Sequence, residues 1–174
     1  GHTGFKGTWL TLWLILLGAK VCGFSNKDKT NPSFFEILKL KKKIRNIYGD
    51  ISKIDHISNV VKSFQPDIIF HLAGQALVKE AYRDPHKTFN TNSFGTLNIL
   101  KASEKSKKLK AIVLITSDKV YKNIEIKRGY KENDIIMGND PYSASKSCAE
   151  IIINMYLNSY AKKDNVFICA TRAG

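Results

Sequence analysis

The amino-acid sequence predicts an α/β protein in which helices cover both faces of a parallel sheet. Segments with the pattern of a strand alternate with segments of helical period along the whole chain of 174 residues. Two of the strand segments, 67–72 and 111–116, are almost continuously apolar. Such runs are typical of strands in a parallel sheet that is covered on both sides. The length corresponds to about one domain.

Each element follows from a local pattern. The strand segments are short and rich in apolar residues, and we expect them at 20–24, 44–48, 67–72, 111–116 and 166–171. The helical segments have apolar residues three or four positions apart, and we expect them at 9–17, at 54–64, at 88–106 and at 142–160. Ser52 is expected to cap the second of these helices. The stretch 25–43 is polar and contains Pro32, so we expect it to be irregular.

A glycine-rich loop opens the sequence. Gly1, Gly4 and Gly7 have the spacing of the turn between the first strand and the first helix of a dinucleotide-binding unit. These glycines permit a tight turn, close approach of a pyrophosphate and packing of helix on sheet. The N–H groups at the start of the helix then face the phosphates. An ordinary buried helix after a glycine turn is the alternative interpretation.

The loop places the chain in a doubly wound (Rossmann) fold, whose strand order is 3-2-1-4-5-6. The first strand, which belongs before Gly1, is missing from this sequence and would lie at the centre of the sheet. We therefore expect the strands at 20–24 and 67–72 to lack a partner between them. We also expect the chain of 174 residues to fold poorly by itself.

The composition limits the possible partners. The net charge is +13, but the denser lysine runs at 39–45 and 105–110 have no interleaved aromatic residues. This pattern indicates a solvated surface, or attraction of an acidic substrate that carries phosphate, rather than a nucleic-acid site. The apolar stretch 9–17 is too short to span a membrane. Cys22, Cys148 and Cys169 lack metal-ligand spacing, so we expect buried free thiols in the cytoplasm and no metal.

Two groups of residues carry candidate chemistry. Tyr142 and Lys146 stand four residues apart on one face of the last predicted helix. A tyrosine hydroxyl is a weak base at neutral pH, but a nearby ammonium stabilises its phenolate. Ser117 follows the strand at 111–116, at the edge where open α/β sheets bind ligands, and there it can bind the same substrate hydroxyl as Tyr142. A packing tyrosine and a surface lysine remain the structural alternative.

These motifs together resemble the extended short-chain dehydrogenases/reductases over essentially the whole chain. The shared features occur in the same order and are Gly1, Gly4 and Gly7, then 49–51, 71–75, 92–96, Ser117, and Tyr142 with Lys146. Within that family, four further stretches are similar to the NAD-dependent nucleotide-sugar 4,6-dehydratases that act on CDP-glucose: 1–10, 116–121, 129–134 and 140–146.

The resemblance implies a lyase of deoxysugar and O-antigen biosynthesis that removes water from CDP-glucose through a hydride transferred to bound NAD and then returned. It implies catalytic roles for Ser117, Asp118, Lys119, Tyr142 and Lys146, with Asp118 as the acid for the leaving water and Lys119 as the base at C5. The implied cofactor-binding residues are Gly1, Gly4, Phe5, Gly7, Asp50, Ile51, Leu72, Ala73, Gln75, Asn92, Tyr142 and Lys146.

Several alternatives remain open at this point. Ser25, Asn26 and Lys27 follow the second strand where an acidic residue would favour NAD, and Lys27 would suit the 2′-phosphate of NADP. A nucleotide-sugar epimerase, a dehydratase acting on UDP-N-acetylglucosamine, or an inactive NAD-binding fragment would share most of the motifs. The Asp118–Lys119 pair argues against the epimerase. The resemblance further implies a homodimer through the helices 88–106 and 142–160, and a missing carboxyl-terminal substrate domain.

Overall fold

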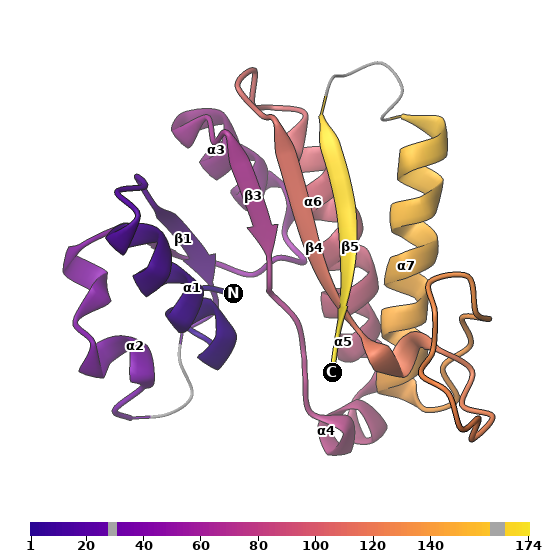
Figure 1. The fold of residues 1–174 in the computed structure, drawn as a ribbon. Helices are drawn as coiled ribbons and strands as arrows, with labels where there is room; N and C mark the ends of the chain where they lie inside the picture. The colour runs from indigo at the N-terminus through magenta and orange to yellow at the C-terminus, as the bar shows by residue number, and fades with distance from the viewer. Residues whose placement is uncertain (28–30, 161–165) are drawn as a thin grey trace.

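The computed structural model describes residues 1–27, 31–160 and 166–174 of an α/β protein (Figure 1). Its strands all pair in parallel and form a two-stranded and a three-stranded sheet. In chain order they are β1 (Cys22–Ser25), β2 (Arg45–Tyr48), β3 (Ile68–His71), β4 (Ala111–Ser117) and β5 (Phe167–Ala173). The sheet orders are β1-β2 and β3-β4-β5. The predicted fold class is confirmed.

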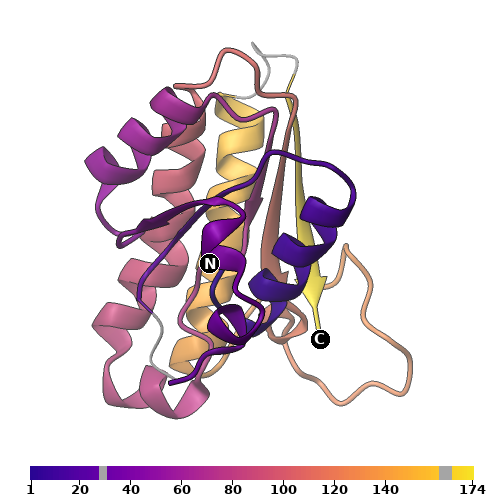
Figure 2. The same cartoon turned by 90° about the vertical axis from the view of Figure 1, so that its left-hand side faces the viewer.

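The helices form a layer on each side of the strands. They are α1 (Phe5–Leu16), α2 (Phe34–Ile37), α3 (Ile54–Phe64), α4 (Val78–Arg83), α5 (Pro85–Phe89), α6 (Gly95–Ser103) and α7 (Pro141–Ser159), with short turns η1 (Leu40–Lys42), η2 (Asn90–Phe94) and η3 (Asp118–Val120). Figure 2 shows α1 on the opposite side of the strands from α3 and α6. The main core joins α3, α6 and α7 to the three-stranded sheet through residues such as Val61, Leu100, Leu114 and Ile153.

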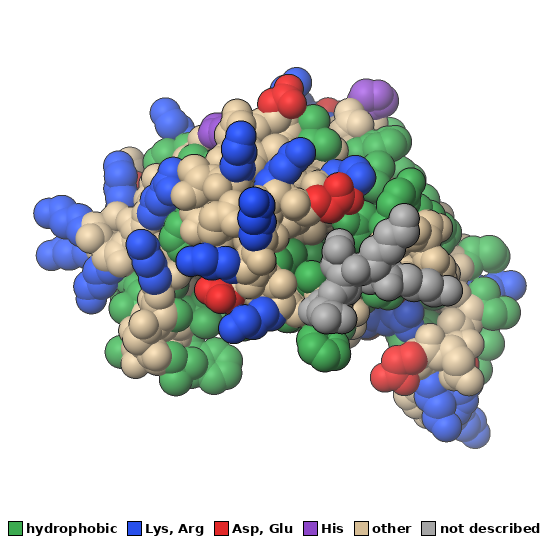
Figure 3. All heavy atoms as spheres, turned by 90° about the horizontal axis from the view of Figure 1, so that it is seen from above, with side chains coloured by type: hydrophobic (Ala, Val, Ile, Leu, Met, Phe, Trp, Pro, Cys, Tyr) green, Lys and Arg blue, Asp and Glu red, His purple; other side chains and the backbone are tan. Residues whose placement is uncertain are grey.

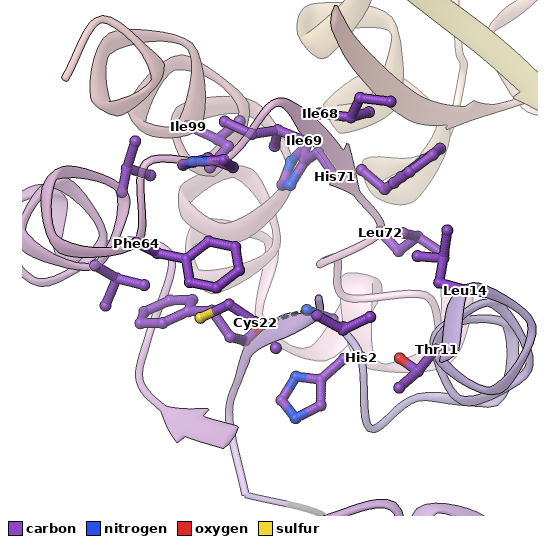
Figure 4. Close-up of a pocket in the computed structure, with 18 of the residues that line it drawn as sticks. His2, Thr11, Leu14, Cys22, Phe64, Ile68, Ile69, His71, Leu72 and Ile99 are labelled. Atoms are coloured by element: carbon purple, nitrogen blue, oxygen red, sulfur yellow. Dashed lines mark hydrogen bonds between the residues drawn. The ribbon is translucent and has the colours of Figure 1, made fainter. Parts of the chain in front are cut away.

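A gap separates β1 from β3 at the centre of the molecule. It contains a cavity of about 530 Å³, with Cys22 of β1 on one side and Ile69 and His71 of β3 on the other (Figure 4). Phe64 and Ile99 extend into the same space from α3 and α6. The facing edges of β1 and β3 do not pair with each other. The prediction that these two strands lack a partner between them is therefore confirmed.

Two local predictions are wrong. Ser52 does not cap α3, because the helix begins one residue later, after Lys53, and the N–H of Ser52 instead donates to Asp50 Oδ1 at 2.9 Å. The stretch 25–43 is not irregular throughout, although its residues 28–30 lie outside the described part. It contains α2 and η1, and α2 begins with a capping box between Ser33 and Glu36.

The long helix expected at 88–106 is divided. Its start is α5, its end is α6, and between them the turn η2 has the wider winding of a π-helix. Two packing features accompany this wider winding. The side chain of Asn92 is buried in the turn, and a Cβ at Gly95 would lie only 2.8 Å from Ile51 Cγ2. A π-turn inside a helix commonly marks a functional position.

The sheet is less covered than its sequence predicts. Ile68 and Phe70 of β3 are 50% and 36% exposed, and Phe167 of β5 is 83% exposed. In β3 the exposed residues alternate with buried ones, and in β5 they alternate with half-buried ones, so one face of the three-stranded sheet is partly open in the described part of the chain. The same geometry corrects the expectation of three buried thiols. All three cysteines are free, but none is fully buried: Cys22 and Cys148 are half-buried and Cys169 is exposed on β5.

The lysine runs lie at the amino-terminal edge of the strands. The run 39–45 leads into β2 and the run 105–110 leads into β4. Figure 3 looks onto this edge and shows Lys and Arg side chains spread across it with a few Asp and Glu among them. Ligands of open α/β sheets bind at the opposite edge, so this geometry supports the interpretation as solvated surface. Among the described residues, no helix is long and apolar enough to cross a membrane.

Candidate active site

The glycine loop packs against the turn that follows β3. A Cβ added to Gly1 would lie 2.5 Å from the backbone nitrogen of Ala73, and one added to Gly7 would lie 2.0 Å from the carbonyl oxygen of Gly1. No side chain fits at either position. Gly4 differs, because a Cβ there would meet only the Gly1 oxygen, at 3.5 Å. Gly1 and Gly7 therefore serve packing, whereas the backbone at Gly4 lies open at the start of α1.

Three hydroxyl side chains hold this loop, and the sequence analysis did not identify them. Thr8 Oγ1 donates to the carbonyl oxygens of His2 and Thr3, at 3.3 and 3.2 Å. Thr3 Oγ1 lies 2.9 Å from Ser25 Oγ at the end of β1. All three hydroxyl residues are buried. Ser25 stands at the end of β1, where an acidic residue would bind a ribose. Its hydroxyl instead supports the glycine loop through Thr3.

Asn92 joins the turn after β3 to α7. Its Oδ1 accepts from the N–H of Gln75 at 2.8 Å, and its Nδ2 donates to the Gln75 carbonyl at 3.0 Å and to Ser145 Oγ at 2.9 Å. The side chain is 1% exposed. A Cβ at Gly74 would lie 3.2 Å from Asn92 Oδ1 and 3.3 Å from Lys146 Nζ. The turn at 72–75 is therefore held between the glycine loop and α7.

Tyr142 and Lys146 are buried at the start of α7, each 9% exposed. Asp140 caps this helix, accepting from the N–H groups of Tyr142 and Ser143 at 2.9 and 3.1 Å. Lys146 Nζ donates to the carbonyl of Ile115 at 3.3 Å, which ties the helix to β4. Burial, reinforced by the nearby charge of Lys6, lowers the pKa of Lys146 to about 8. A lysine held in this way is not the solvated surface residue of the structural alternative.

Ser117, Asp118 and Lys119 lie together at the carboxyl end of β4. Ser117 is buried, donates to Asp118 Oδ1 at 3.0 Å and accepts from the N–H of Lys119 at 3.3 Å. Asp118 and Lys119 are exposed in the turn η3. Burial by itself would raise the pKa of the Asp140 carboxyl. Hydrogen bonds from Ser143 and Tyr142, together with the charge of Lys119, outweigh this effect and keep the pKa below its usual value.

The remaining predicted cofactor residues are arranged unequally. Asp50 is exposed after β2, whereas the side chain of Ile51 is only 6% exposed and belongs to the core. Phe5 is 74% exposed on the first turn of α1. Leu72, the residue that follows β3, borders the central gap (Figure 4). Apart from the Ile51 side chain, the predicted residues thus gather along the carboxyl edge of the strands.

His71, the last residue of β3, is a packing residue. It is 5% exposed, and Nε2 lies 3.3 Å from Thr96 Oγ1. Burial, together with the positive charges of Lys146 and the amino terminus, lowers its pKa to about 3. The imidazole is therefore neutral near pH 7 and contributes a hydrogen bond to the core rather than a charge to the site.

The comparisons with known proteins agree with this geometry. The chain is 42% identical to CDP-glucose 4,6-dehydratase from Salmonella typhimurium, over an alignment of 179 positions that covers all of this chain and 50% of that enzyme. It is 26% identical to CDP-paratose 2-epimerase from Salmonella typhi, with 93% of this chain and 52% of the relative covered. The chain thus spans about half the length of these relatives.

Solved structures show the same fold. The dTDP-glucose 4,6-dehydratase DesIV from Streptomyces venezuelae, a double mutant solved with NAD, superimposes with a TM-score of 0.80 at 20% identity, covering 98% of this chain and 52% of that one. A UDP-glucose 4-epimerase from Thermus thermophilus in complex with NAD gives 0.81 at 24% identity, with coverage of 99% and 52%.

Residues 1–173 match the sequence profile of the family described as GDP-mannose 4,6 dehydratase. That match extends from the glycine loop through the turn after β4 to the end of β5. The chain therefore belongs to the GDP-mannose 4,6-dehydratase family of extended short-chain dehydrogenases/reductases.

Proposed function

We propose that the whole protein containing this chain removes water from CDP-glucose to give CDP-4-keto-6-deoxyglucose. The observation that carries the proposal is the pair Asp118–Lys119, exposed at the carboxyl end of β4, beside a helix that buries Tyr142 and Lys146. The 42% identity to a CDP-glucose 4,6-dehydratase supports the same substrate. Loss of water requires an acid and a base beyond a tyrosine–lysine pair, and Asp118 and Lys119 supply these two groups.

The loop and the carboxyl edge fit a dinucleotide. The open backbone at Gly4 and the N–H groups at the start of α1 would hold the pyrophosphate, and Lys146 would bind the ribose next to the nicotinamide. Asp50 is placed to contact the adenine part after β2. NAD bound here supplies a position that accepts the hydride from C4 of the sugar and later returns it to C6. The NAD-bound relatives of the same fold support this choice over NADP.

Tyr142 begins the reaction by taking the proton of the C4 hydroxyl. The ammonium of Lys146, four residues along the same helix face, stabilises the phenolate that does so. Ser117 Oγ, buried at the end of β4, would turn its O–H from Asp118 Oδ1 to donate to the same substrate oxygen. With the C4 hydride taken up by the bound cofactor, C4 would become a ketone, which makes the proton on C5 acidic.

Lys119 then removes the C5 proton, for which its amine must be neutral. Asp118 donates a proton to the C6 hydroxyl, which departs as water and leaves a double bond between C5 and C6. The bound cofactor would supply the hydride for C6, and the protonated Lys119 would return the proton to C5. Both groups extend from one turn, so a hexose held beside Ser117 can meet them together.

We further infer a homodimer in the cytoplasm. The free cysteines are those of a reducing compartment. Ile151 and Met155 on α7 are 61% and 38% exposed, and this apolar surface supports pairing of that helix with the same helix of a second copy.

A nucleotide-sugar epimerase has no use for an acid and base that remove water, so the Asp118–Lys119 pair favours the dehydratase.

The proposal is tested with the whole protein, NAD and CDP-glucose, by following the 4-keto-6-deoxy product through its absorbance in base. We expect Lys119→Ala to bind NAD normally and to lose product formation by at least about 100-fold. Lys127→Ala, an exposed lysine of the same excursion between β4 and α7, is the matched control. A fully active Lys119→Ala enzyme, or a wild type that turns over another nucleotide sugar but not CDP-glucose, would contradict the proposal.

A further inference from the structure

We propose that Glu150 and Arg172 form a positioning pair that fixes the turn carrying Asp118 and Lys119 relative to the helix carrying Tyr142 and Lys146. The inference rests on the proposed function, because it assigns the pair to the step in which water leaves. Both residues line the open hollow beside Asp118, and the role proposed for them is to hold the neighbouring residues in place. Both act through their neighbours.

Glu150 lies on the catalytic face of α7. Tyr142, Lys146 and Glu150 follow one another at intervals of four residues, so their side chains share one stripe of the helix. Glu150 is 7% exposed, and its Oε1 accepts from Thr116 Oγ1 at 2.5 Å. Thr116 is the residue before Ser117 in β4. The carboxylate therefore ties the helix to the strand directly ahead of the turn.

Arg172 meets Glu150 from β5. Its Nε donates to Oε1 at 3.2 Å and its Nη2 donates to Oε2 at 3.1 Å, which is a two-point contact between planar groups. The side chains are 17% and 7% exposed. Glu150 is buried and Arg172 is partly buried, so removal of Arg172 would leave an uncompensated carboxylate inside the protein. The hydrogen bonds and charge of Glu150, joined by Tyr121, raise the pKa of Arg172 and hold it charged.

The remaining nitrogen of Arg172 reaches the chain after the turn. Nη1 donates to Tyr121 Oη at 2.7 Å and to the carbonyl of Glu132 at 3.1 Å. The guanidinium carbon also lies 4.8 Å from the centre of the Tyr121 ring, which in turn stacks on Tyr130 at 5.0 Å. Tyr121 directly follows η3. One guanidinium thus holds both the residue after the turn and the excursion that leads to α7.

The pair consequently holds the turn from both ends. Thr116, just before the turn, donates to Glu150 on α7, and Tyr121, just after the turn, accepts from Arg172 on β5. Val120 anchors the end of the turn directly, because it is fully buried and its carbonyl accepts from Ser147 Oγ of α7 at 3.1 Å. Asp118 and Lys119 are exposed, and their place depends on this anchor and on the flanking contacts of the pair. By contrast, Lys146 has its own bond to Ile115, and the start of α7 has its cap at Asp140. Loss of the pair should therefore disturb Asp118 and Lys119 more than Tyr142 and Lys146.

The test separates the two chemical steps. In the whole protein with bound NAD and CDP-glucose, rapid mixing measures the rate at which reduced nicotinamide forms and the rate at which the 4-keto-6-deoxy product forms. Arg172→Lys keeps the charge but cannot make the planar two-point contact. We expect it to slow elimination by about 10- to 100-fold while oxidation at C4 changes less than about threefold, because a misplacement near 1 Å is enough for such a loss. Reduced nicotinamide should therefore accumulate.

A matched control uses the same substitution elsewhere. Arg128 makes a two-point contact with Asp134 at the surface of the same excursion, and Arg128→Lys should leave both rates within about twofold of wild type. Glu150→Gln provides a second variant that should show the same selective loss. If Arg172→Lys and Glu150→Gln lowered both steps equally, or neither step, in an active enzyme, the positioning role would be wrong. A wild type that forms neither reduced nicotinamide nor product would instead overturn the proposed function, and this inference with it.

Discussion

Replacing Lys146 by methionine should make the protein more stable. Lys146 is 9% exposed, and burial together with the charge of Lys6 lowers its pKa from 10.5 to about 8. At about 1.4 kcal/mol for each pKa unit, holding this ammonium inside the folded protein costs about 3 kcal/mol near pH 7. Methionine has a similar length and no charge to bury, so Lys146→Met should recover about 2–3 kcal/mol once the lost bond to Ile115 is allowed for.

The gain should depend on pH in a defined direction. The folded pKa lies below the unfolded one, so the penalty on the wild type is present in full below pH 8, where both states are protonated. It diminishes as pH rises from about 8 to 10.5, because only the unfolded state still binds the proton there. The advantage of Lys146→Met should thus shrink by about 2 kcal/mol, to about 0–1 kcal/mol at about pH 9.5.

Urea denaturation of the whole protein without cofactor, at pH 7 and at about pH 9.5, measures both quantities. Lys62→Met, which removes an exposed lysine from α3, is the control and should change the free energy of unfolding by less than about 0.5 kcal/mol. The reasoning is refuted if Lys146→Met is less stable than wild type at pH 7, or if its advantage is the same at both pH values. The variant should also be inactive, because it lacks the ammonium beside Tyr142.

Two further outcomes follow from the glycine loop. Gly7→Ala should destabilise the protein and abolish NAD binding, because its Cβ would lie 2.0 Å from the Gly1 oxygen. Gly4→Ala should melt like wild type and only weaken NAD binding, because a Cβ there meets no close neighbour. Thermal melting and NAD titration measure both effects, and equal melting of the two variants would contradict the reasoning.

Much of the fold could be predicted from the spacing of apolar residues, which indicated the strand segments and their parallel pairing. The unpaired edges of β1 and β3 beside the central gap followed from the glycine-loop motif and the usual strand order of this fold. The exposed face of β3 and β5 did not follow, because a continuous apolar run does not reveal whether a second layer of helices is present. The short helix α2 was missed although its signal, Ser33 followed three residues later by Glu36, is printed in the sequence.

The candidate site shows the same division. The spacing of four residues predicted that Tyr142 and Lys146 share one helix face. The position of Ser117 at the end of a strand predicted that it lies at the carboxyl edge of the sheet. The division of the helix around Asn92 was out of reach, because it depends on bonds to Gln75 and Ser145, which are distant in sequence. The burial of Glu150 could have been suspected from its place four residues after Lys146. Its partner on β5 could not, since nothing local in the sequence links positions 150 and 172.

The stripe on α7 makes the orientation of one helix decisive. Successive turns carry Tyr142, the proposed proton acceptor, then Lys146, the cation proposed to stabilise it, and then Glu150, whose carboxylate binds residues of the neighbouring strands. Sliding the register of this helix by a single residue would swing all three by about 100° together. Insertions or deletions upstream of Pro141 are therefore tolerable only where Asp140 still caps the helix at the same position, because a rotated helix would displace the proposed site residues together.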